Sequence, residues 1–119
     1  MASYAEDLPD QCPPADAVDA EWDTLYRAVP SGSVDVQHFA SKAAQGDKPS
    51  PLDDPCRFAS CSLFTIPAPA EKMLQYPRYQ GGSVVKLKIS EGAGKAKKKK
   101  KHVDFWAYRG FDFLGAIEE

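Results

Sequence analysis

The clearest structural signal in the sequence is the alternating hydrophobic pattern of residues 83–89, which directly follow Gly81 and Gly82. Hydrophobic residues at every second position are typical of a β-strand with one buried face. Residues 103–108 alternate in the same way, and the glycine- and lysine-rich segment 91–101 between the two is expected to be a loop. We therefore predict that 83–89 and 103–108 pair as a C-terminal antiparallel hairpin across that loop.

The rest of the chain is divided by prolines and glycines into short segments. Their hydrophobic patterns predict, in chain order, a helix over 15–22, a strand over about 24–29, a helix over 35–44, a loop over 45–55, a strand over 57–66, a helix over 67–76 and a short apolar element over 111–117. This order predicts an α+β fold: a small single domain with a curved antiparallel sheet and two or three short helices. We expect that domain over 15–119 and a flexible, proline-containing leader over 1–14.

Composition excludes several classes of protein. No apolar run approaches the roughly 20 residues that a membrane span needs, and no basic segment followed by an apolar one marks a secretory signal. The three cysteines, Cys12, Cys56 and Cys61, are odd in number and irregular in spacing, so they predict no disulfide framework. We expect reduced thiols in a cytoplasmic protein and no metal site.

Charge is divided unevenly along the chain. Residues 1–54 carry 11 acidic and 3 basic side chains, whereas residues 55–119 carry 6 acidic and 12 basic ones, five of them lysines 97–101. A solvated hairpin tip explains this run best, because no aromatic residue interleaves with the lysines to stack on bases and no arginine reads base edges. Nucleic-acid binding through Lys95 and lysines 97–101, and a nuclear-import signal, are the less favoured alternatives.

A second set of residues suggests a nucleotide pocket. Arg27 lies in the apolar segment 25–30, where its guanidinium needs an acidic or phosphate partner. Ser60 and Ser62 share one face of the strand predicted over 57–66. An ion pair for Arg27 and ordinary strand packing for the serines are the structural alternatives.

The order of these motifs resembles the ADP-ribosyltransferase superfold and the related RES-like toxins. The resemblance rests on the Leu-Tyr-Arg segment that ends at Arg27 and on the Ser-x-Ser segment of Ser60 and Ser62. It implies that an arginine on an early strand contacts phosphates, that the serines order a nicotinamide ribose pocket, and that a late acidic residue orients the ribose. Applied to this sequence, the resemblance implies that Arg27 holds phosphate, that Ser60 and Ser62 shape the pocket, and that the cofactor is NAD.

The last predicted strand offers two further possibilities. His102 can meet Ser60 or Cys61 across paired strands, in which case the histidine is a base and its neighbour a nucleophile. We group His102 with the nucleotide-binding residues and assign no catalytic residue. Trp106 and Tyr108 share the strand face of His102, so this strand either exposes an aromatic surface to a protein partner or is buried on both faces.

Three functions are therefore carried forward. The first is ADP-ribosyltransferase-like binding of, or action on, a nucleotide such as NAD. The second is a non-enzymatic protein-interaction domain that uses Trp106 and Tyr108, and the third is nucleic-acid binding through the lysines. None requires a membrane.

Overall fold

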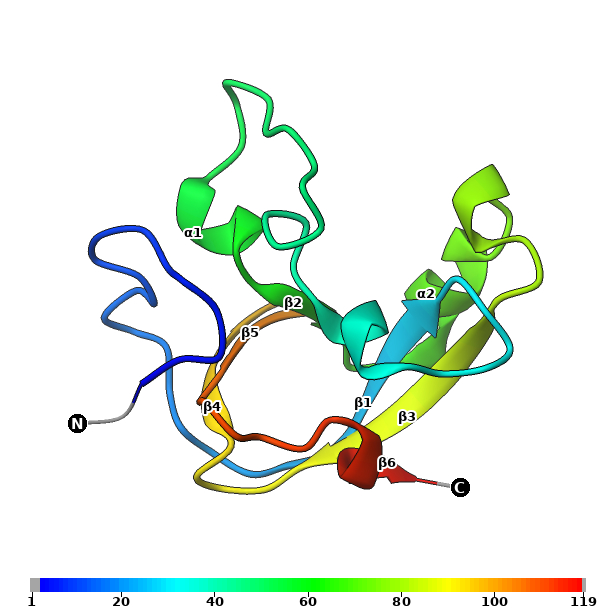
Figure 1. Ribbon diagram of the computed structural model, residues 1–119. Coiled ribbons are helices and arrows are strands. Elements are labelled where there is room, and N and C mark those ends of the chain that lie inside the picture. The colour runs from blue at the N-terminus through cyan, green and yellow to red at the C-terminus, as the bar shows by residue number, and fades with distance from the viewer. Residues whose placement is uncertain (1–2, 119) are drawn as a thin grey trace.

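An antiparallel β-sheet with the strand order β4-β5-β2-β1-β3-β6 organises the protein. The computed structural model describes residues 3–118, and within them the strands are β1 (Trp22–Val29), β2 (Cys61–Phe64), β3 (Ser83–Ile89), β4 (Gly94–Lys99), β5 (His102–Ala107) and β6 (Ile117–Glu118). The helices are α1 (Pro55–Phe58) and α2 (Pro67–Met73), with 3-10 turns η1 (Val36–Phe39), η2 (Pro77–Tyr79) and η3 (Leu114–Ala116). The sheet curls so that β4 and β5 face β1 and β3 across its hollow side (Figure 1). The α+β class with a curved sheet is thus confirmed.

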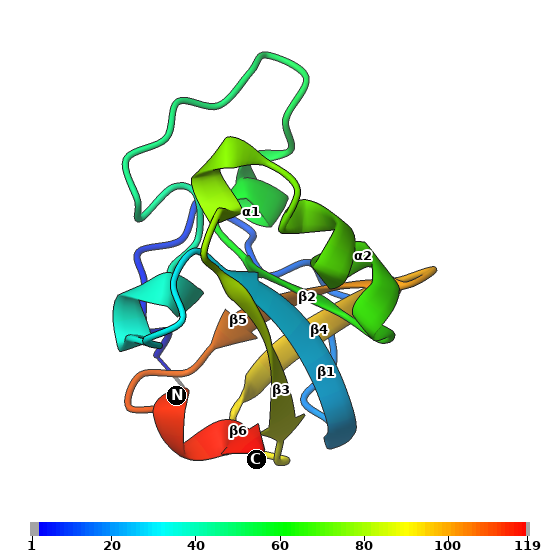
Figure 2. The ribbon, with the colours of Figure 1, turned by 90° about the vertical axis from the view of Figure 1, so that its right-hand side faces the viewer.

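The hydrophobic core fills the hollow side of the sheet. On β3, Val85, Leu87 and Ile89 are buried between exposed lysines, as the alternation predicts. Aromatic side chains from two connections close the core, with Phe39 of η1 stacked on Phe113 at 5.0 Å between ring centroids. Helix α2 packs on the outer side of the sheet, against β1, β2 and β3 (Figure 2). No helix in the described part of the chain is both long and apolar enough to cross a membrane.

The predicted pairing of 83–89 with 103–108 in a C-terminal hairpin is wrong. Strand β3 pairs with β1 and β6, whereas β5 pairs with β2 and β4. The segment expected to be a loop contains β4, in which buried Gly94 and Ala96 alternate with half-exposed Lys95 and Lys97. The chain reverses at Lys100, whose φ of 58° suits a tight turn. A short local hairpin costs less loop-closure entropy than the longer pairing that we predicted.

Two predicted helices and one strand are also corrected. Residues 15–22 form no helix, because Val18 exchanges two backbone hydrogen bonds with Ala96 and ties this segment to β4. The helix expected over 35–44 is only the 3-10 turn η1. The strand expected over 57–66 begins as helix α1, since the Asp54 carboxylate accepts hydrogen bonds from two backbone N–H groups of its first turn.

A disulfide joins Cys12 to Cys56, contrary to the expectation of reduced thiols, and only Cys61 is a free cysteine within residues 3–118. The two bonded residues are 44 positions apart, so their approach depends on the tertiary fold and not on a local spacing.

The described part of the leader, 3–14, lies against the domain. The Ala5 N–H donates to the carbonyl of Ala107 at 2.9 Å, and the leader's Cys12 is bonded to α1. Positions 1–2 of the predicted leader are outside the described residues.

Candidate functional site

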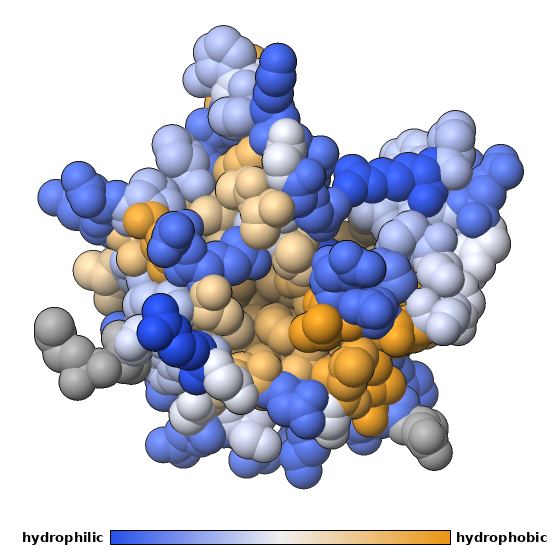
Figure 3. Space-filling view, in the orientation of Figure 1, coloured by the Kyte–Doolittle hydropathy of each residue, from blue (hydrophilic) through white to orange (hydrophobic). Residues whose placement is uncertain are grey.

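A cavity of about 450 Å³ lies at one end of the sheet. Strands β1, β2 and β5 form one wall, and the connections at 40–58 and 73–79 form the others. In the space-filling view the molecule is indented between the lobe that carries the long loop before α1 and the lobe that carries η2 (Figure 3). The cavity is lined by every residue that the sequence assigned to a nucleotide pocket: Arg27, Ser60, Ser62 and His102.

Arg27 lies where β1 and β2 separate. These strands share one registered pair, Tyr26 with Phe64, so the neighbouring Ser62 carbonyl accepts a hydrogen bond from the Arg27 guanidinium at 2.8 Å. The guanidinium also donates to the carbonyls of His38 at 2.9 Å and Ala40 at 3.4 Å. Arg27 therefore joins β1 to β2 and to the connection around η1. Within residues 3–118 it forms no ion pair, so the predicted salt bridge to an acid is absent.

Ser62 and His102 meet across β2 and β5. The register pairs Ser62 with Asp104 and Phe64 with His102, which places Ser62 diagonally opposite the imidazole. Ser62 Oγ lies 2.9 Å from His102 Nε2, within hydrogen-bond distance. The other ring nitrogen, Nδ1, is 3.3 Å from Asp104 Oδ1 but is not aligned for a hydrogen bond, and it is buried without another partner in the described residues.

Asp104 is a buried carboxylate held from two sides. Arg57 Nε donates to its Oδ2 at 3.1 Å, and Ser60 Oγ lies 3.3 Å from its Oδ1. The single hydroxyl proton of Ser60 is shared between this oxygen and the Arg57 carbonyl, which lies closer, at 2.6 Å. These contacts fix the carboxylate beside His102, and the charge of Arg57 balances a charge that would be costly to bury alone.

Burial favours the neutral form of the His102 imidazole. Burial lowers the pKa of His102 below its usual value of 6.5, because a charged ring would lose hydration. Asp104 opposes this shift and Arg57 reinforces it. A neutral imidazole can accept a proton, which is the state that a general base requires.

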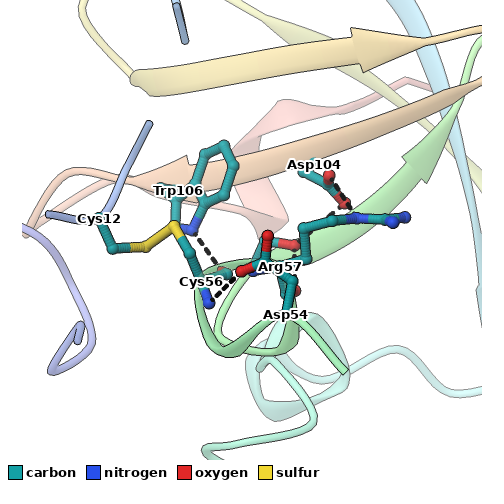
Figure 4. The surroundings of a disulfide bond; sticks show 7 residues. Cys12, Asp54, Cys56, Arg57, Asp104 and Trp106 are labelled. Carbon is teal, nitrogen blue, oxygen red and sulfur yellow. Dashed lines mark hydrogen bonds and ion pairs between the residues drawn. A yellow bond between two sulfur atoms is a disulfide. The ribbon is translucent and has the colours of Figure 1, made fainter. Parts of the chain in front are cut away.

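Helix α1 and the disulfide hold Arg57 in place (Figure 4). Asp54 caps the helix, Cys56 is bonded to Cys12, and the indole N–H of Trp106 donates to the Cys56 carbonyl at 3.0 Å. The helix has only four residues and could not persist alone in water. The position of Arg57 at the cavity therefore depends on contacts from outside the helix.

The aromatic surface considered for β5 does not form. Trp106 is buried, with 2% of its surface exposed, and the strand is covered on both faces over residues 103–106. Tyr108 packs on Tyr4 of the leader, with ring centroids 5.4 Å apart.

Cys61 is also unsuited to be a nucleophile. It points into the core on the opposite side of β2, and burial raises the pKa of its thiol.

Two central residues of the cavity, Arg57 and Asp104, were not assigned to it from sequence. Asp104 had a detectable signal, since it lies two residues after His102 and alternation places both side chains on one face of a strand. Arg57 had no such signal. A strand was expected over 57–66, and the direction of the Arg57 side chain depends on the short helix α1 that forms there instead. Besides Arg27, three basic side chains lie on the cavity wall: Lys42, Arg57 and Arg78.

No protein family, curated protein or solved structure matches this chain.

Proposed function

We propose that the cavity binds a nucleotide such as NAD and that the protein is ADP-ribosyltransferase-like. The observation that carries this proposal is the convergence on one cavity of Arg27, Ser62 and His102, from three different strands, and of Ser60, which directly precedes β2. A volume of about 450 Å³ is in the range of small-molecule sites. Polar groups and a cavity of small-molecule size thus occur together, which supports the proposal.

The charge of Arg27 supports an anionic ligand. A guanidinium has five N–H groups, and three hydrogen bonds to carbonyls leave two of them free to donate to phosphate. Carbonyl oxygens orient the guanidinium without neutralising it, and no carboxylate of residues 3–118 is within ion-pair distance. An arginine held in this way is preorganised for a phosphate group.

The cations of the cavity wall support the same ligand. Lys42 is exposed, and the side chains of Arg57 and Arg78 are each about half exposed. Arg57 is paired with Asp104 and Arg78 with Asp47, and the exposed part of each guanidinium, together with Lys42, can still attract a phosphate group. In this proposal Asp104 is the late acidic residue that the resemblance requires.

Calorimetric titration with NAD, ADP-ribose and adenosine tests the proposal. We expect NAD and ADP-ribose to bind more tightly than adenosine, because only they carry phosphates. The variants Ser62→Ala and Arg57→Gln should weaken binding, whereas the control Arg109→Gln, at an exposed residue outside the cavity, should not. The proposal fails if millimolar NAD and ADP-ribose do not bind the parent protein, or if all three variants bind them equally well.

Nucleic-acid binding is a second candidate, favoured by the exposure of lysines 98–101 at the tip of the β4–β5 hairpin. In the described residues only Lys97 of this run forms an ion pair, with Asp16 at 3.1 Å. Binding of a single-stranded oligonucleotide that weakens steeply with salt, and that is lost when the lysines are replaced by serine, would support it. Salt-independent or absent binding would exclude it.

The cytoplasmic location expected from the cysteines stays a prediction. The disulfide argues against a reducing compartment, since such bonds persist mainly where the surroundings are oxidising. Alkylation of the protein immediately after its source cells are lysed would decide the matter. Cys12 and Cys56 take up the reagent only if they are reduced in the cell.

A further inference from the structure

We propose that Ser62 is a nucleophile activated by His102 and Asp104, and that the cavity hydrolyses small carboxylic esters that carry a negative charge. This activity goes beyond nucleotide binding and does not depend on it. It rests on the mutual positions of three side chains on adjacent strands.

The first element of the argument is the contact between the hydroxyl and the base. Ser62 is partly exposed and lies on the cavity wall, so a substrate can reach its Oγ. His102 Nε2 lies 2.9 Å from this oxygen, within the distance over which a base removes a proton. Both side chains lie on the sheet face that points away from the core residues Leu63 and Val103.

The second element is the orientation of the imidazole. His102 Nδ1 is buried, and Asp104 Oδ1 lies 3.3 Å from it. A proton on Nδ1 is favoured there because it faces a carboxylate, and it leaves Nε2 as the acceptor of the Ser62 hydroxyl proton. Catalytic hydrogen bonds that are poorly aligned in the free protein commonly tighten when substrate binds.

The third element is the support of the carboxylate. Two groups that do not belong to the Ser62–His102 pair contact the carboxylate of Asp104. Arg57 Nε contacts one of its oxygens and the Ser60 hydroxyl contacts the other. Asp104 can therefore hold the imidazole and stabilise the imidazolium that forms during the reaction, a task that requires a fixed charge.

The cavity restricts the substrate. Its volume of about 450 Å³ admits a small acyl group and a small alcohol. Four basic side chains line it (Arg27, Lys42, Arg57 and Arg78) against three acidic ones (Asp53, Asp54 and Asp104), and this balance favours an acyl group that ends in a carboxylate over a neutral one.

The reaction follows from these positions. Ser62 Oγ attacks the carbonyl carbon while its proton passes to His102 Nε2; the bond to the alcohol oxygen then breaks, and that oxygen takes the proton from His102. Water next attacks the acyl carbon, giving its proton to His102, and the bond to Ser62 Oγ breaks as this proton returns to the serine. The sum is ester and water giving acid and alcohol, with no other reactant.

Two measurements on the full chain test the proposal. A fluorophosphonate probe followed by peptide mass spectrometry should label Ser62 in the folded protein and not in urea-unfolded protein. After the spontaneous rate of each ester is subtracted, the protein should hydrolyse the 4-nitrophenyl monoester of succinic acid faster than 4-nitrophenyl acetate. The variants Ser62→Ala and His102→Gln should lower the succinyl ester rate by roughly 100-fold or more, the usual contribution of general-base and nucleophilic catalysis.

A strand serine outside the cavity supplies the matched control. Ser83→Ala removes a partly buried hydroxyl from β3 and should leave both labelling and hydrolysis unchanged. The proposal is overturned if the folded parent protein is not labelled at Ser62, if folded His102→Gln is labelled as fast as the parent, or if the parent does not hydrolyse the succinyl ester above its spontaneous rate. Circular dichroism establishes that each variant is folded, and the parent labelling experiment decides the matter even if a variant is not. Nucleotide titration is a separate measurement, so either proposal can fail alone.

Discussion

Replacing Arg27 with lysine should lower the free energy of unfolding by about 2–3 kcal/mol. The guanidinium donates to the carbonyls of His38, Ala40 and Ser62, which belong to two separate segments. An ammonium group is a single point and can reach one of these segments, so roughly two hydrogen bonds are lost at about 1–1.5 kcal/mol each. For a chain of 119 residues this corresponds to a fall in Tm of about 10 °C.

Urea unfolding, followed by the fluorescence of Trp22 and Trp106, measures this loss. The control Arg109→Lys alters an exposed arginine for which the described residues provide no side-chain partner, and it should leave the midpoint unchanged. If Arg27→Lys and Arg109→Lys unfold at the same urea concentration as the parent, the three carbonyl contacts contribute nothing. The reasoning that Arg27 joins β1 to β2 and η1 would then be wrong.

Three further predictions concern the lysines, the disulfide and the buried histidine. Replacing lysines 97–101 with serine should change Tm by no more than a few degrees, because surface charges contribute little; a loss of roughly 2 kcal/mol would contradict this. Replacing Cys12 and Cys56 with serine should cost about 4 kcal/mol in chemical denaturation, since the bond closes a loop of 44 residues; an unchanged midpoint would argue that the bond does not form. The depressed pKa of His102 means that the unfolded chain binds the proton more readily, so the parent should lose stability as pH falls below about 6.5. His102→Gln should lose less over the same range in denaturation curves at several pH values, and identical pH dependence would contradict the assignment.

Part of the candidate site could be predicted from sequence because its residues stand out from their neighbours. Arg27 is a lone charge in an apolar segment, and Ser60 and Ser62 are two hydroxyl side chains spaced two residues apart. The nucleophile–base pair was expected from Ser60 or Cys61 with His102. The register of β2 and β5 instead places Ser62 beside the imidazole, while Ser60 turns toward Asp104 and Cys61 enters the core. Alternation gives the face of each side chain, but only the register decides which ones meet.

The sequence by itself determined the local features of this protein: the strand β3 with its buried valine, leucine and isoleucine, and the class of a small α+β domain with a curved sheet. These depend on periodicity, which is a property of neighbouring residues. The tertiary structure decided the rest. It placed β2 between β1 and β5, turned the lysine segment into strand β4, bonded Cys12 to Cys56 and buried Trp106 under that bonded segment. Each of these depends on contacts between residues far apart in the chain, because burial of a common core, and not local preference, selects among the pairings that the strands allow.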